Sequence, residues 1–153
     1  MRFEFSGAPE ITAPRQQVWA KLMDPEFVAA SAPGVESVVA SDPTHFKVVS
    51  GLGVGSLKIH FTLEVELSDL EPGRQLKMRA RGNAPGSAVD VLSHLQLEEV
   101  DGATTRLNWS AACEASGTVA SIGTRLLEGA ARRLTEQFWT DFARRTSAGT
   151  RNA

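Results

Sequence analysis

The sequence predicts an α+β fold in which a seven-stranded antiparallel sheet curls around one long C-terminal helix. From Leu57 to Leu67 every odd position is apolar and every even position is polar. Such alternation is typical of a long strand with one buried and one solvated face. From Thr118 to Arg145 there is no proline, and apolar residues recur at spacings of three and four. That spacing predicts a single helix about 40 Å long.

The N-terminal part predicts one strand and two short helices. Residues 2–12 suit the strand. Pro14 suits a helix start, where its missing N–H costs nothing, and Val18 and Leu22 share a helical face. Asp24 and Pro25 end this helix, and a second can follow over residues 25–32.

The middle of the chain predicts the remaining strands. Residues 35–42 and 45–51 form a hairpin around a turn at Asp42, and further strands cover residues 57–67, 75–82, 89–100 and 105–115. The alternation breaks between Leu92 and Leu95, which predicts a β-bulge.

Composition favours one soluble domain. The chain has 153 residues, 42% of them apolar, and we expect one domain over residues 1–146 and a disordered tail over 147–153. The net charge of −2 gives no general attraction to nucleic acid. Cys113 is the only cysteine, which excludes an internal disulfide and a cysteine-based zinc site. Neither a secretory signal nor a membrane-spanning run is evident, so we expect a reducing, intracellular setting.

The predicted helix is too narrow to cover the predicted sheet. Seven strands about 4.8 Å apart make a sheet roughly 30 Å wide, whereas a helix is about 10–12 Å across. Bulky side chains or a ligand must cover the rest. Small residues on both elements favour a cavity, with a fully packed interior as the alternative. We expect this cavity to be lined by Phe27, Val48, Ile59, Phe61, Met78, Val91, Trp109, Ala111, Ile122, Leu126, Ala130 and Leu134.

No catalytic or metal-binding pattern is evident. Residues 51–56, "GLGVGS", lead into a strand and not into the helix that a phosphate loop needs. This segment and residues 82–87 suit hairpin loops, which could gate an opening or be ordinary turns. The three histidines lack metal-ligand spacing, and Cys113 has no histidine placed to activate it. We therefore predict neither a metal site nor an enzyme.

Three segments together resemble the family of the carbon monoxide dehydrogenase G-subunit. They are "APRQQVWAKLMDPEFVAASAPGVESV" over residues 13–38, "GLGVGSLK" over 51–58 and "GTVASIGTRLLEGAARRLTEQFW" over 117–139. The resemblance runs from about Phe3 to Phe142. It implies a helix-grip fold of the START-like superfamily with an apolar cavity.

The resemblance also implies a non-catalytic accessory role. Members of that family are associated with molybdenum hydroxylases of the carbon monoxide dehydrogenase type, with docking of that enzyme at the cytoplasmic membrane, and with a lipophilic quinone. We accordingly expect a cytoplasmic protein that binds a quinone or other lipid and touches the inner face of the membrane peripherally. Many members continue into a membrane-seeking segment, whereas this sequence stops after "RRTSAGTRNA", so we expect weak membrane binding by the isolated protein.

Other functions remain open at the level of sequence. A polyketide-cyclase-type enzyme could use the same fold, but it would need polar groups inside the cavity. A general carrier of hydrophobic ligands, or a structural adaptor with a filled interior, would also fit. The segment from Thr118 onward carries six arginines and three acidic residues. This charge could contact an anionic membrane or an acidic partner.

Overall fold

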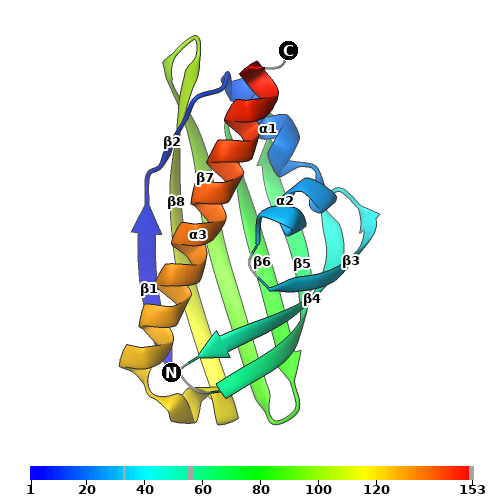
Figure 1. Cartoon of the computed structure of the whole chain (residues 1–153), viewed down its shortest axis with the longest axis vertical. Helices are drawn as coiled ribbons and strands as arrows, with labels where there is room; N and C mark the ends of the chain where they lie inside the picture. Colours follow the sequence, from blue (N-terminus) through cyan, green and yellow to red (C-terminus); the bar gives the residue numbers. More distant parts are fainter. Residues whose placement is uncertain (33, 55–56, 152–153) are drawn as a thin grey trace.

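An eight-stranded antiparallel sheet curls around the C-terminal helix α3 (Figure 1). The computed structural model describes residues 1–32, 34–54 and 57–151. The strand order is β1-β8-β7-β6-β5-β4-β3, and β2 also pairs with β8. The strands are β1 (Arg2–Gly7), β2 (Glu10–Ile11), β3 (Val35–Asp42), β4 (His45–Val54), β5 (Leu57–Glu71), β6 (Gln75–Ala84), β7 (Ser87–Asp101) and β8 (Thr104–Gly117).

The eighth strand arises because the first predicted strand is divided in two. Pro9 lies between β1 and β2 and has no N–H to donate to a ladder. Both pieces still pair with β8, through Phe3 opposite Cys113 and Ile11 opposite Thr105. The fold class is otherwise as predicted.

The alternation in β5 orients its side chains as predicted. Phe61 is buried, with 5% of its surface exposed, whereas His60 faces solvent and pairs with Glu36 at 3.1 Å. The side chain of Leu57 lies outside the described residues, as do residues 55 and 56 of the "GLGVGS" loop.

The predicted bulge in β7 is wrong. Pairing of β7 with β6 and β8 runs without a register shift from Ser87 to Glu99. The alternation of apolar and polar residues breaks because an apolar residue faces outward and the next, polar residue faces inward. Leu92 faces outward and is 57% exposed, while Ser93 occupies an inward position and its hydroxyl donates to the Ser110 carbonyl at 2.8 Å.

The helical segments differ from prediction at both ends of α3. A 3₁₀ turn, η1 (Thr118–Ile122), comes first, and Gly123 separates it from α3 (Thr124–Arg151). Gly123 has φ of 106°, a left-handed value that interrupts a continuous helix. The helix also continues past residue 146, where we expected a disordered tail. It comes closest to the sheet at β1, β2 and β4.

The two short helices lie where the sequence predicts them. They are α1 (Arg15–Leu22) and α2 (Pro25–Ser31). Pro14 is the N-cap of α1, and the Asp24 carboxylate caps α2 by accepting from the N–H groups of Glu26 and Phe27 at 3.2 and 3.3 Å. Within the described residues, no helix is long and apolar enough to cross a bilayer.

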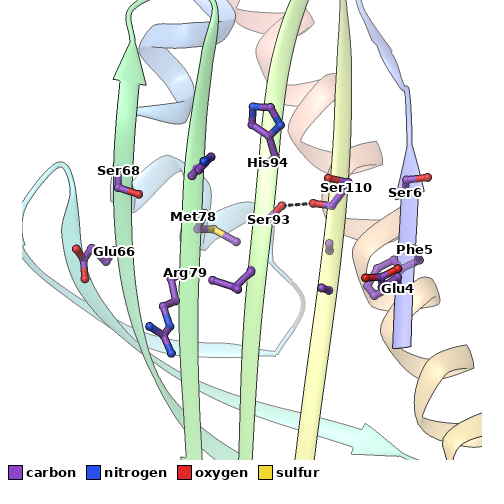
Figure 2. A pocket seen from close by; sticks show the side chains of 14 residues that line it. Glu4, Phe5, Ser6, Glu66, Ser68, Met78, Arg79, Ser93, His94 and Ser110 are labelled. Atoms are coloured by element: carbon purple, nitrogen blue, oxygen red, sulfur yellow. Dashed lines mark hydrogen bonds between the residues drawn. The ribbon is translucent and has the colours of Figure 1, made fainter. Parts of the chain in front are cut away.

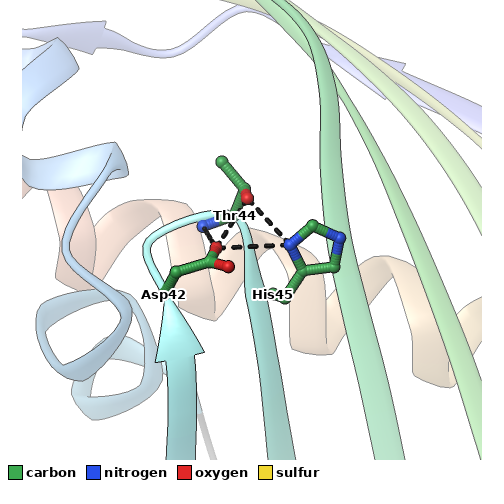
Figure 3. Close-up of polar contacts among 3 residues, drawn as sticks. All are labelled: Asp42, Thr44 and His45. Atoms are coloured by element: carbon green, nitrogen blue, oxygen red, sulfur yellow. Dashed lines mark hydrogen bonds and ion pairs between the residues drawn. The ribbon is translucent and has the colours of Figure 1, made fainter.

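A hydrogen-bonded turn closes the β3–β4 hairpin (Figure 3). Asp42 Oδ1 accepts from the Thr44 N–H at 2.7 Å and from its hydroxyl at 2.6 Å, and it lies 3.2 Å from Nδ1 of His45. The hydrogen bonds from Thr44, followed by that from His45, lower the pKa of Asp42 to about 2. The turn thereby fixes the margin of the sheet that curls toward α3.

The described buried residues form two hydrophobic clusters. The first joins α1, the aromatic end of α3 and strands β5–β8, and it includes Leu76, Leu107, Trp109 and Phe142. The second joins β1, β5, β8, η1 and the first turns of α3. Phe5 and Val91 are partly buried against both clusters.

Candidate functional site

The apolar surface between the two clusters is the candidate site. Val65, Met78 and Val91 point inward from β5, β6 and β7, yet each is only partly buried. Leu134 of α3 is also partly buried and belongs to neither cluster. Solvent therefore reaches apolar surface on both the sheet and the helix. We call this set of four residues the inner surface.

A row of mostly small residues crosses the inward side of the sheet. The row pairs Val65 with Ala80, Ala80 with Val91, and Val91 with Cys113. From α3, Ala130 and Ala131 pack near the end of this row. Because alanine and cysteine are short, this row and the facing helix contribute little side-chain volume to the interior.

The structure buries five of the twelve predicted lining residues and partly buries six more. Val48, Phe61, Trp109, Ala111 and Ala130 are buried. The partly buried members are Phe27, Ile59, Met78, Val91, Ile122 and Leu134.

The prediction for Leu126 is wrong, because this side chain is 49% exposed. Leu126 lies within α3, about 160° around the helix from the buried Phe142, and therefore faces solvent. The neighbouring Leu127 lies on the same side of the helix as Ala130 and Phe142 and is buried.

An aromatic wall borders the inner surface, and the predicted lining missed most of it. Trp139 stacks on Trp109 with ring centroids 6.4 Å apart and meets Phe138 edge-on at 4.7 Å. Phe142 meets Phe27 of α2 edge-on at 5.5 Å. Such contacts stabilise aromatic clusters beyond the burial of their area. The signal in the sequence was the group of aromatic residues at 138, 139 and 142 of the helix.

A hollow lies on the opposite, solvent-facing side of the sheet (Figure 2). It has a volume of about 810 Å³, and short residues such as Ser6, Ser68 and Ser110 contribute to its lining. Arg79 donates to Asp90 at 2.8 Å beside it, and this hydrogen bond lowers the pKa of the Asp90 carboxyl. Sequence reasoning missed the hollow because short polar residues on a strand look like any solvated face.

A second groove, of about 440 Å³, runs between β1–β2 and α3. Phe5, Trp109 and Trp139 form its apolar part, and Arg132 and Glu136 of α3 its polar part. The aromatic wall thus contributes to this groove as well as to the first cluster.

The histidines lie away from the inner surface, whereas Cys113 is opposite Val91 but is a weak nucleophile. His45 and His60 are beside exposed carboxylates, and Nε2 of His94 lies 3.1 Å from the Gln75 side-chain oxygen. Burial raises the pKa of the Cys113 thiol to about 11, so it is protonated at neutral pH and a poor nucleophile. The described part of the chain contains no group of three or more His, Cys, Asp or Glu residues that could hold a metal ion.

Solved structures share this fold at low sequence identity. A conserved protein from Geobacillus kaustophilus superposes with a TM-score of 0.88 at 24% identity, over 95% of this chain and 96% of that one. The Zhui aromatase/cyclase from Streptomyces sp. R1128 gives 0.72 at 16% identity, over 95% and 94%. A START superfamily protein from Mycobacterium smegmatis gives 0.75 at 10% identity, over 95% and 97%. The fold is therefore START-like.

Sequence comparison identifies the family. No curated protein matches the sequence significantly. Residues 7–147 match the family of the carbon monoxide dehydrogenase G-subunit, CoxG. This match covers both short helices, the sheet from β2 to β8 and most of α3. The chain therefore belongs to the CoxG family of carbon monoxide dehydrogenase G-subunits.

Proposed function

We propose that the protein is a non-catalytic accessory protein that binds a lipophilic ligand, most specifically a quinone, at the inner surface. The observation that carries the proposal is the partial exposure of inward-facing apolar residues from both the sheet and the helix. Exposed apolar surface of this kind is stabilised when a ligand covers it. The quinone itself is suggested by family membership, and the nearby aromatic rings suit a flat ring system.

The expected affinity is modest. If a ligand buries ~300 Å² of apolar surface at about 25 cal/mol per Å², the gain is roughly 7 kcal/mol before the costs of association. Micromolar binding is therefore attainable without a strong polar contact.

Family membership also suggests the partner. We propose that the protein serves a molybdenum hydroxylase of the carbon monoxide dehydrogenase type at the cytoplasmic face of the membrane, with weak peripheral lipid contact of its own. Co-purification of that enzyme with the tagged protein, and sedimentation with anionic liposomes at low but not high salt, would support this placement.

The aromatase/cyclase among the structurally similar proteins suggests a second candidate function, that of a cyclase-type enzyme. A cyclase would need acid–base groups facing the bound substrate. The polar side chains paired with residues of the inner surface are Ser93, opposite Met78, and Cys113, opposite Val91. A serine hydroxyl and a thiol with a pKa of about 11 are weak acid–base groups at neutral pH, which favours binding over catalysis.

The test is calorimetric titration of a short-tailed menaquinone analogue into the wild type and two variants of α3. Leu134→Trp adds an indole at the inner surface, and Gln137→Trp adds the same group at an exposed position of the same helix. We expect micromolar binding by wild type and Gln137→Trp, and at least tenfold weaker binding by Leu134→Trp. Equal affinities in all three proteins, or no binding by the wild type, would refute the proposal.

A further inference from the structure

Helix α2 lies between α3 and β3, the strand at one edge of the curled sheet. It contacts α3 on one side and β3, at the curled margin of the sheet, on the other (Figure 1). Its residues Phe27 and Val28 pack against the first cluster but stay partly buried. A ligand that passes between α3 and the β3 margin must therefore pass this helix.

Arg145 of α3 holds α2 in place through its guanidinium group. Its Nη1 donates to the Phe27 carbonyl at 3.0 Å and to the Ser31 hydroxyl oxygen at 2.8 Å. Its guanidinium carbon also lies 4.2 Å from the centre of the Phe27 ring. Ser31 is almost completely buried, and its hydroxyl donates to the same Phe27 carbonyl at 3.1 Å. The contact therefore combines charged hydrogen bonds with a cation–π interaction.

Few other polar contacts hold α2. Its remaining hydrogen bonds in the described structure are internal or come from the adjoining Asp24 cap. Helix α1 is tied separately, because Gln17 Nε2 donates to the Thr146 carbonyl at 3.3 Å. A helix of seven residues is not stable alone and depends on tertiary contacts. Loss of Arg145 should therefore loosen α2 without releasing α1.

We propose that Arg145 is a positioning residue that holds α2 between α3 and β3 and so limits the rate of ligand entry and exit on this side of the inner surface. This inference rests on the proposed ligand-binding function. The ligand contacts the same inner-surface residues whether α2 is held or released. The Arg145 contact therefore affects the association and dissociation rate constants more than it affects the dissociation constant, which is their ratio.

The kinetic test compares Arg145→Ala with Arg144→Ala. Arg144 is the exposed neighbour on the same helix turn, where it lies 3.4 Å from Asp141. Stopped-flow mixing with the short-tailed menaquinone analogue should show that the association and dissociation rate constants both rise about tenfold in Arg145→Ala. This increase is expected because the variant loses the charged hydrogen bonds that hold the short helix α2. The dissociation constant should change less than about threefold, and Arg144→Ala should behave as wild type. Unchanged rates in Arg145→Ala would overturn the proposal.

Hydrogen exchange without ligand separates this inference from the proposed function. In Arg145→Ala, amides of residues 26–31 should exchange faster while those of α1 keep their protection, and urea unfolding should show that the fold persists. If wild type binds no quinone but α2 is still released, the proposed function fails and the role of Arg145 in holding α2 stands. If α2 keeps its protection in Arg145→Ala, the inference fails whatever the ligand does.

Discussion

Gly7 lies directly against the indole of Trp109 across the β1–β8 pair. A Cβ at Gly7 would fall 2.8 Å from the indole nitrogen and 2.9 Å from two ring carbons. Phe5 and Trp139 also contact that ring, so it has little freedom to move away. Gly7→Ala should therefore destabilise the protein by about 1–3 kcal/mol in urea unfolding.

Gly102 provides the control for this overpacking. A Cβ there meets nothing within 4 Å, and its backbone is not in the left-handed region. Gly102→Ala should leave the free energy of unfolding within about 0.5 kcal/mol of wild type. Equal stability of the two variants would show that the strand or the indole moves aside freely.

Phe61 and His60 should respond in opposite ways to truncation although they are adjacent. Phe61→Ala removes a buried ring from the second cluster and should cost about 3–5 kcal/mol. His60→Ala removes a half-exposed ring beside Glu36 and should cost less than about 1 kcal/mol. Thermal and urea unfolding measure both, and similar losses would mean that the faces of β5 are assigned wrongly.

The buried thiol of Cys113 should make the protein less stable at alkaline pH. Burial raises its pKa from 9.0 to about 11, with a smaller contribution from the charge of Asp90. Between these values the unfolded chain has released a proton that the folded chain keeps. The free energy of unfolding should therefore fall as the pH rises from about 9 to 11.

Cys113→Ala isolates this effect from other groups that titrate in the same range. Between about pH 9 and 11, the free energy of unfolding should fall more steeply with pH in wild type than in Cys113→Ala. The native thiol should also react slowly with iodoacetamide at pH 8 and rapidly in urea. Fast labelling of the folded protein would contradict the burial of Cys113.

The carboxyl of Asp42 should have a pKa well below that of an ordinary aspartate. Because its folded pKa is lowered to about 2 from 3.8, its contribution to stability is complete above the unfolded pKa and is lost as the pH falls through about 2. A carboxyl carbon titration by NMR should show this low midpoint. Thr44→Val removes the hydroxyl donor and should move the midpoint upward. A wild-type midpoint near 4 would show that the turn is open in solution.

Periodicity predicted the elements well and their irregularities poorly. Alternation in β5 placed Phe61 inside, because a two-residue repeat has only two possible phases. Leu126 was misplaced because Leu126 and Leu127 both match a spacing of three or four to later apolar residues, and only Leu127 lies on the buried side of α3. Leu92 and Ser93 were misread as a bulge because an exposed leucine and an inward serine give the same pattern as a register shift.

The candidate site could be predicted only in part. Residue types indicated an apolar interior with small side chains, but not that Leu134 would be partly exposed and belong to neither cluster. The link from Arg145 to α2 joins residues 118 and 114 positions apart, and no local pattern reports such a contact. The hollow on the solvent face likewise depends on five strands side by side.

The pairing of β1 with β8 also governs how the chain reaches this structure. Strand β1 precedes the other strands of this sheet in the chain but pairs with β8, which follows them, so its apolar residues Phe3 and Phe5 remain unpaired until nearly the whole sheet has been synthesised. Pairings this distant in sequence slow folding, to milliseconds or seconds in domains dominated by them. During that interval the nascent chain carries an unpaired aromatic strand, which is a natural binding segment for a chaperone.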